Sequence, residues 1–166
     1  MIRPADANET AGAWRCALGH DGPTAMILSR QNLPVLEGTD AASVADGAYV
    51  LVDADDAVIT LFGAGSEVQL AVEAARRLDE QGHPARVVSV PSFERFAAAP
   101  DATRDSVLRR DLPSIAIEAG IAQGWYRYAD EVVSIERFGA SAPGATVMHE
   151  LGMNVNHLVD RARALL

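Results

Sequence analysis

The chain has 166 residues, of which 49% are hydrophobic, and its formal net charge is −9. This length allows one domain with a substantial core, or one domain plus part of another. All of its positive side chains are arginine, and the absence of lysine excludes a Schiff-base or P-loop mechanism. The excess of negative charge argues against nucleic acid or an anionic membrane as a partner.

The N-terminal residues and the cysteine content indicate the cellular compartment in which the protein is expected. No apolar run approaches the roughly 18 residues that a membrane span requires, and residues Met1–Asp6 lack the basic-then-apolar pattern of a secretory signal. The single cysteine, Cys16, excludes an internal disulfide and suits a reducing compartment. We therefore expect a cytoplasmic protein without a membrane partner. His20 follows Cys16 by four residues, but a packed cysteine is favoured over a thiol–base pair.

The first segment reads as a helix followed by a strand. Alanines and apolar residues over Asn8–Leu18 have helical spacing, with Asp6 or Asn8 as the N-cap. Thr24–Leu28 is expected to form a short buried strand, and Arg30 follows at its carboxyl end. One helix and one strand cannot form a domain, so this segment must pack on something else. Residues Gln31–Asp46, rich in small and acidic side chains, are predicted to be a linker.

A regular α/β pattern begins at Ala48. Apolar runs at Tyr49–Val52 and Ala57–Phe62 flank the turn sequence Asp53-Ala54-Asp55-Asp56, which predicts an antiparallel hairpin. Strands and helices then alternate along the rest of the chain. The remaining expected strands are Arg86–Val90, Ser114–Glu118 and Val132–Ile135, and the remaining expected helices are Asp101–Arg110, Ala145–Leu151 and Val155–Leu166. This alternation predicts a three-layer α/β/α sandwich with a mostly parallel sheet and one antiparallel edge.

A glycine turn separates the second of these apolar runs from another expected helix. Ser66 and Gln69 have the spacing of a capping box, and Gly82 is expected to end the helix. The turn Gly63-Ala64-Gly65 also invites a dinucleotide interpretation, because such turns bring a pyrophosphate to a helix N-terminus. However, Val68 occupies the third glycine position and the next strand lacks an acidic residue at its end. Dinucleotide binding is therefore disfavoured.

Other candidate constellations are weaker. Gly139–Pro143 resembles a nucleophile elbow, but proline replaces the second glycine, so Ser141 is better explained as a helix cap with Pro143 in the first turn. His149 has no second histidine at zinc-binding spacing. No catalytic set is therefore evident.

Three aromatic residues lie close together in the sequence. Trp125, Tyr126 and Tyr128 could cover the sheet edge or form an interface, and we slightly favour an interface over a plain core.

Four stretches together resemble transketolases, in the same order along the chain. They are Ser29–Pro34 after an apolar segment, Gly65–Val68 leading into a helix, Ala85–Ser92, and Arg137–Pro143. The resemblance runs from about Arg3 to Leu166. It implies a five-stranded mixed sheet, with residues 1–34 as the end of the pyrimidine-binding domain, 35–47 as a linker and 48–166 as the C-terminal domain. The chain would then begin inside a domain, as a fragment does.

The resemblance also implies a function. Transketolases use thiamine diphosphate and a divalent metal, Mg²⁺ or Ca²⁺, to transfer a two-carbon ketol unit between sugar phosphates of the pentose phosphate pathway. Arg30 matches the arginine that contacts the substrate phosphate, a role suited to its charged fork. The Gly-Asp-Gly…Asn motif that holds the diphosphate and metal has no counterpart here.

We therefore expect no catalytic residue, cofactor ligand or metal ligand in this chain, and no activity of the chain alone. Its expected roles are structural support and homodimerisation of the intact enzyme. Two alternatives remain open: a fragment of a dihydroxyacetone-synthase-like enzyme, and a free-standing, non-catalytic assembly module.

Overall fold

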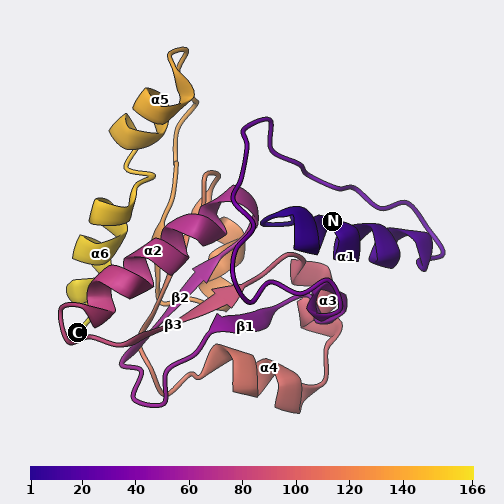
Figure 1. Cartoon of the computed structure of the whole chain (residues 1–166), viewed down its shortest axis with the longest axis horizontal. Coiled ribbons are helices and arrows are strands. Elements are labelled where there is room, and N and C mark those ends of the chain that lie inside the picture. Colours follow the sequence, from indigo (N-terminus) through magenta and orange to yellow (C-terminus); the bar gives the residue numbers. More distant parts are fainter.

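A five-stranded mixed sheet forms the centre of the computed structural model, which describes residues 1–166 (Figure 1). The strand order is β1-β3-β2-β4-β5. Strands β2 to β5 run parallel to one another, whereas the edge strand β1 is antiparallel to β3. The strands are β1 (Tyr49–Val52), β2 (Ile59–Gly63), β3 (Ala85–Ser89), β4 (Ser114–Ile117) and β5 (Glu131–Val133). The predicted five-stranded mixed sheet is confirmed.

The predicted hairpin is wrong, because β1 pairs with β3 rather than with β2. Strand β2 lies between β3 and β4, so neither of its edges is open to β1. Every residue of β2 is buried, whereas every residue of β1 is only half-buried. A strand that is apolar on both faces suits the centre of a covered sheet, and the half-buried strand lies at its edge.

Helices cover both faces of the sheet, which confirms the three-layer sandwich. Side chains of α2 (Val68–Asp79) and α6 (Val155–Arg163) complete one buried cluster with alternate residues of β2 and β4. The other cluster includes residues of α3 (Phe93–Ala98), α4 (Asp101–Leu108) and the 3-10 segment Ala122–Arg127. The two-residue period of each strand sends its side chains alternately to these two layers. No helix combines the length and the hydropathy needed to cross a lipid bilayer.

The N-terminal segment contains one helix but no sheet of its own. Helix α1 (Ala7–Leu18) is capped by Asp6, whose Oδ1 accepts a 3.0 Å hydrogen bond from the Glu9 amide. The strand expected at Thr24–Leu28 is reduced to a single parallel bridge between Ile2 and Met26. With no further strand beside it, this stretch is not buried as predicted.

Two expected helix caps are also wrong. Ser66 lies in a 3-10 turn, Gly65–Glu67, before α2, and its hydroxyl donates to the Glu67 side chain instead of capping the helix. The Gln69 side chain donates to the Ser66 carbonyl at 3.0 Å. Of the two reciprocal hydrogen bonds of a capping box, neither is therefore formed in the predicted way, and Gln69 bonds the Ser66 backbone as a donor to its carbonyl. Helix α5 (Gly144–Glu150) follows Pro143 and has no side-chain cap, so Ser141 does not cap it.

The aromatic residues after β4 divide between core and surface. Trp125 and Tyr128 are buried, whereas Tyr126 is 64% exposed. The ring of Trp125 meets that of Phe93 edge to face, with centroids 4.8 Å apart. The slight preference for an interface was therefore wrong for Trp125 and Tyr128, which belong to the core beside β4.

Candidate functional site

Arg30 lies in an exposed loop that follows the bridge between Ile2 and Met26. Its guanidinium forms no hydrogen bond or ion pair within the chain, so all of its donors are free for a ligand. The turn itself is stabilised locally, because the Ser29 hydroxyl donates to the Gln31 carbonyl at 3.0 Å. This arrangement can receive an anion such as a phosphate.

Two hollows meet at this loop. One, of about 470 Å³, lies between the start of α1 and residues Leu28 to Leu33. The other, of about 860 Å³, lies between α2, α5 and the start of α6. Gln31 lines both hollows, so the Arg30 loop stands between them. Figure 1 shows α5 projecting beyond α2 and α6, and no residue of α5 is buried.

A buried charged cluster occupies the carboxyl edge of the sheet. Glu67 follows β2 and Glu118 follows β4, and both are almost fully buried. The Arg3 guanidinium donates to both oxygens of Glu118, at 2.5 and 2.9 Å, and to Glu67 at 3.0 Å. The Trp125 indole N–H donates to Glu118 at 2.8 Å. Arg3 therefore joins the ends of two neighbouring parallel strands.

Burial and the opposite charges shift the pKa values of this cluster in opposite directions. Burial raises the pKa of Glu67, although the Ser66 hydroxyl and the Arg3 charge partly oppose the shift. Burial by itself would lower the pKa of Arg3, but its hydrogen bond and charge contacts with the carboxylates raise it. The guanidinium is therefore fixed in its charged form, which is the condition for holding two carboxyl groups together.

The backbone of Arg3 fills the glycine turn that the sequence offered for a pyrophosphate. The Gly65 amide donates to the Arg3 carbonyl at 3.1 Å, and the Arg3 amide donates to the Pro91 carbonyl at 2.8 Å. The gap that remains beside Arg3 measures about 20 Å³, which is room for about one water molecule. A dinucleotide therefore does not fit at this turn.

The residues present do not fit thiamine diphosphate with its metal either. No group of three or more His, Cys, Asp or Glu side chains is placed to hold a metal ion. The two carboxyl groups at the sheet edge already bind Arg3. This chain therefore offers neither the acidic ligand set nor the free glycine turn that a diphosphate–metal site needs.

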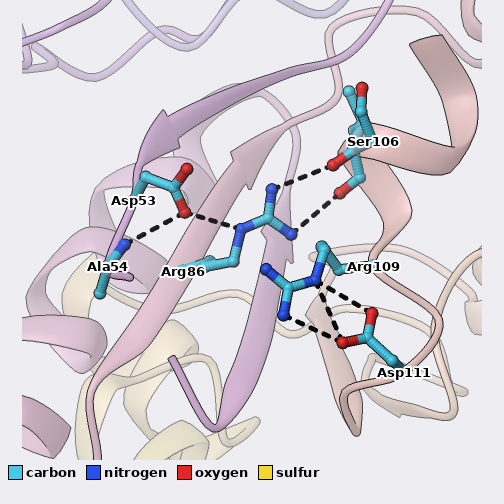
Figure 2. Close-up of polar contacts among 7 residues, drawn as sticks. Asp53, Ala54, Arg86, Ser106, Arg109 and Asp111 are labelled. Carbon is cyan, nitrogen blue, oxygen red and sulfur yellow. Dashed lines mark hydrogen bonds and ion pairs between the residues drawn. The ribbon is translucent and has the colours of Figure 1, made fainter. Parts of the chain in front are cut away.

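A second charged cluster lies at the opposite edge of the sheet (Figure 2). Buried Arg86, at the start of β3, donates to Asp53 at 2.8 Å and to the carbonyls of Ser106 and Val107, near the end of α4. The bidentate ion pair between Arg109 and Asp111 lies beside it. Positive and negative side chains balance in this cluster, so its evident role is to attach α4 to the sheet rather than to bind an anion.

Comparison with known proteins identifies the family. Residues 47–154, more than half of the chain, match the Transketolase-like TK C-terminal domain family. The chain belongs to the transketolase family. The resemblance seen in the sequence is therefore confirmed, and the sheet and its helices are those of a transketolase C-terminal domain.

Individual transketolases match along the whole chain. The enzyme of Halalkalibacterium halodurans is 50% identical over 175 residues, covering 100% of this chain and 26% of the relative. Transketolase from Leishmania mexicana superposes with a TM-score of 0.96 at 41% identity, covering 99% of this chain and 24% of that one. A Pichia stipitis transketolase in complex with sedoheptulose 7-phosphate gives 0.93 at 36% identity, with the same coverage. The chain thus spans about a quarter of the length of these transketolases.

The sequence pattern points to Arg30 but not to Arg3. The signal for the carboxyl partners was present, because Glu67 and Glu118 each come shortly after an apolar strand. Parallel strands bring such residues to one edge of a sheet. Arg3 itself carries no local signal, since 115 residues separate it from Glu118. In this transketolase chain the ion pair is visible only in the folded structure.

Proposed function

We propose that the chain is the C-terminal quarter of an enzyme that transfers a two-carbon ketol unit between sugar phosphates, and that Arg30 binds the substrate phosphate. The observation that carries this proposal is the free, exposed guanidinium of Arg30, in a segment that matches transketolases along its whole length. A planar guanidinium makes two parallel hydrogen bonds to a phosphate, which gives affinity and orientation together.

The cofactor of the intact enzyme, thiamine diphosphate with Mg²⁺ or Ca²⁺, is proposed to bind outside this chain. When bound, it supplies the carbanion chemistry of ketol transfer. The two buried carboxyl groups after β2 and β4, those of Glu67 and Glu118, already bind Arg3. The chain alone is therefore proposed to be inactive.

We assign residues 1–34 to the end of the pyrimidine-binding domain, 35–47 to a linker and 48–166 to the C-terminal domain. Exposed hydrophobic side chains support this division, because five of the eleven large ones lie in residues 1–34 and a sixth lies at the first residue of the linker. They are Met1, Trp14, Leu18, Ile27, Leu28 and Val35. Such a concentration marks a surface that packs against protein, and its proposed partner is the rest of the pyrimidine-binding domain.

The intact enzyme is proposed to be a cytoplasmic homodimer to which this chain contributes contacts. Sedimentation of the purified chain over a range of concentrations tests that contribution. A concentration-dependent shift towards dimer supports it, and a single monomer species at the highest concentration contradicts it.

The proposed role of Arg30 is tested in a grafted enzyme. The 166 residues replace the matched quarter of the Halalkalibacterium halodurans transketolase, which is 50% identical. Losing a charge-assisted hydrogen-bond pair of about 1.5–3 kcal/mol predicts that Arg30→Met raises KM for a phosphorylated sugar about 10- to 100-fold. The same variant should leave KM for the unphosphorylated sugar nearly unchanged.

Arg15→Met is the matched control, because Arg15 is a second exposed arginine of the N-terminal segment with no ion pair. It should change neither KM. An Arg30→Met graft that keeps its KM for the phosphorylated sugar would contradict the assignment. Activity with formaldehyde as acceptor would favour the dihydroxyacetone-synthase alternative.

A further inference from the structure

The crevice that Arg3 fills has a defined place in the fold. In open α/β sheets, ligands bind outside the carboxyl ends of the strands, where successive crossovers turn to opposite sides. Here β2 leads to β3 on one side, and the chain then returns to place β4 on the other side of β2. The crevice therefore lies between the ends of β2 and β4, which are followed by Glu67 and Glu118. Arg3 takes the position of a ligand there.

Backbone hydrogen bonds connect Arg3 to the segment that leads to Arg30. Arg3 is fixed to the C-terminal domain through Pro91 and Gly65. Its neighbour Ile2 donates to the Ala25 carbonyl at 2.8 Å and accepts from the Ile27 amide at 2.9 Å. Only Leu28 and Ser29 lie between Ile27 and Arg30. The contacts of Arg3 at the sheet edge therefore fix Ile2, and the hydrogen bonds of Ile2 in turn fix the segment that leads into the Arg30 loop.

We propose that Arg3 is a positioning residue for Arg30: bound in the ligand crevice of the C-terminal sheet, it holds in place the bridged segment that presents Arg30 to the substrate phosphate. This inference rests on the proposed role of Arg30. It gives the C-terminal domain a definite part in substrate binding, through the Arg3 contacts with Glu67 and Glu118.

Charge makes this attachment specific for arginine. The two carboxyl groups are buried, and the guanidinium fork is the one group that bonds both of them. A neutral side chain would leave two buried carboxyl groups facing each other, which disfavours the closed crevice. A lysine would keep the charge but lose the fork, so its effect should be intermediate.

Besides Arg3, a second set of contacts attaches the N-terminal segment to the sheet, and it should keep that segment folded when Arg3 is changed. Buried Glu9 of α1 accepts hydrogen bonds from Tyr49 on β1 and from Ser89 on β3, at 2.7 and 2.6 Å. Helix α1 therefore remains attached to the sheet without Arg3. Substitution of Arg3 should release the bridge near Ile27 without unfolding the domain.

The first experiment is hydrogen exchange on the 166-residue chain. In Arg3→Met, the amides of the bridge at Ile2 and Ile27 should exchange about tenfold faster or more, because the hydrogen bonds there open without global unfolding. Amides of β2 and β4 should keep their protection. Arg76→Met is the control, since Arg76 forms only surface ion pairs with Glu73 and Glu80 on α2 and its neighbouring turn. Unchanged exchange at Ile27 in Arg3→Met would overturn the inference.

The second experiment measures kinetics in the grafted enzyme. Arg3→Met should raise KM for the phosphorylated sugar severalfold and leave kcat, as well as KM for the unphosphorylated sugar, nearly unchanged. Arg3→Lys should recover part of the loss. Adding Arg3→Met to Arg30→Met should have no further effect on KM, because the positioned group is already gone.

The outcomes separate this inference from the proposed function. If Arg30→Met raises KM and Arg3→Met does not, Arg3 is not a positioning residue, while the role of Arg30 stands. If Arg30→Met has no effect on KM but Arg3→Met accelerates exchange at Ile27, the phosphate role of Arg30 is wrong and the attachment through Arg3 is structural only. Equal losses of kcat with both sugars in Arg3→Met would also contradict positioning.

Discussion

Glu9 and Ser89 are joined by a 2.6 Å hydrogen bond across 80 residues of sequence, and this contact fixes the first helix to the end of a central strand. The same carboxyl group accepts from the Tyr49 hydroxyl and from the Ala5 amide, and it is fully buried. Together with Arg3, it makes the N-terminal segment part of one folded unit with the sheet.

The stabilisation that the buried Glu9 side chain contributes should depend on pH. Burial raises the pKa of Glu9, its three hydrogen bonds oppose the shift, and the charge of Asp6 adds to it. Burial and the Glu9 charge also raise the pKa of Tyr49, so its hydroxyl remains a donor. Because the folded state binds the Glu9 proton more tightly, the stabilisation is complete below the unfolded pKa, near 4.5, and is lost as pH rises through the folded pKa.

Glu9→Gln removes this titration. Urea unfolding from about pH 4.5 to about pH 8 should therefore show a shallower fall of the unfolding free energy in the variant than in the wild type. The comparison uses the slope with pH rather than the absolute stability, since a glutamine amide has one oxygen and cannot replace both Glu9 oxygens, of which one accepts from Ala5 and the other from Tyr49 and Ser89. Parallel pH profiles for the two proteins would show that Glu9 is ionised equally in the folded and unfolded states.

Arg86 should matter more to stability than its neighbour Arg109. Arg86→Met leaves the carbonyls of Ser106 and Val107 without their donor in a buried setting, which should cost about 2 kcal/mol of unfolding free energy. Arg109→Met is the matched control in the same cluster (Figure 2), because its pair with Asp111 is exposed. The control should leave the denaturation midpoint unchanged. Equal losses in both variants would contradict the assigned role of Arg86.

Two glycines separate the effect of backbone conformation from that of close packing. Both Gly47 and Gly82 have a φ near +80°, so alanine at either costs about 1–2 kcal/mol. A Cβ at Gly47 would also lie 2.2 Å from the Phe96 amide nitrogen, whereas nothing lies within 4 Å at Gly82. Gly47→Ala should therefore cost more than about 3 kcal/mol in urea unfolding. Similar losses at both positions would show that the contact with α3 is not tight.

Two buried threonines should respond in opposite directions to valine. The Thr60 hydroxyl, at the centre of the sheet, has no hydrogen-bond partner, so Thr60→Val should stabilise the fold by about 1 kcal/mol. The Thr39 hydroxyl donates to Asp6 at 2.6 Å, so Thr39→Val should destabilise it by about 1–3 kcal/mol. Thermal unfolding of both variants tests the pair, and a destabilised Thr60→Val would indicate an unseen partner for that hydroxyl.

Much of the fold could be predicted from local pattern. Alternating apolar runs gave the strands of a covered sheet, and the cap at Asp6 gave the start of α1. Strand pairing could not be predicted, because the choice of β3 over β2 as the partner of β1 depends on which edge remains open after β4 has paired. The strand expected at Thr24–Leu28 failed for the same reason, since a strand exists only beside another strand.

The candidate site could also be predicted only in part. Arg30 stands out because the sequence around it resembles transketolases, and its phosphate role remains a prediction. The crevice bound by Arg3 was missed, because its members come from three distant parts of the chain. The glycine turn at Gly65 looked like an anion site from local sequence alone, whereas the fold fills that turn with the backbone of Arg3.

The most direct test of the account is calorimetric titration with thiamine diphosphate and Mg²⁺, performed on the purified chain and on the grafted enzyme. We expect saturable binding to the grafted enzyme and no binding heat with the chain alone, because no group of His, Cys, Asp or Glu side chains in the chain is placed to hold a metal ion and Arg3 occupies the crevice at the sheet edge. Saturable binding to the 166-residue chain would contradict the account and place a cofactor site within this domain.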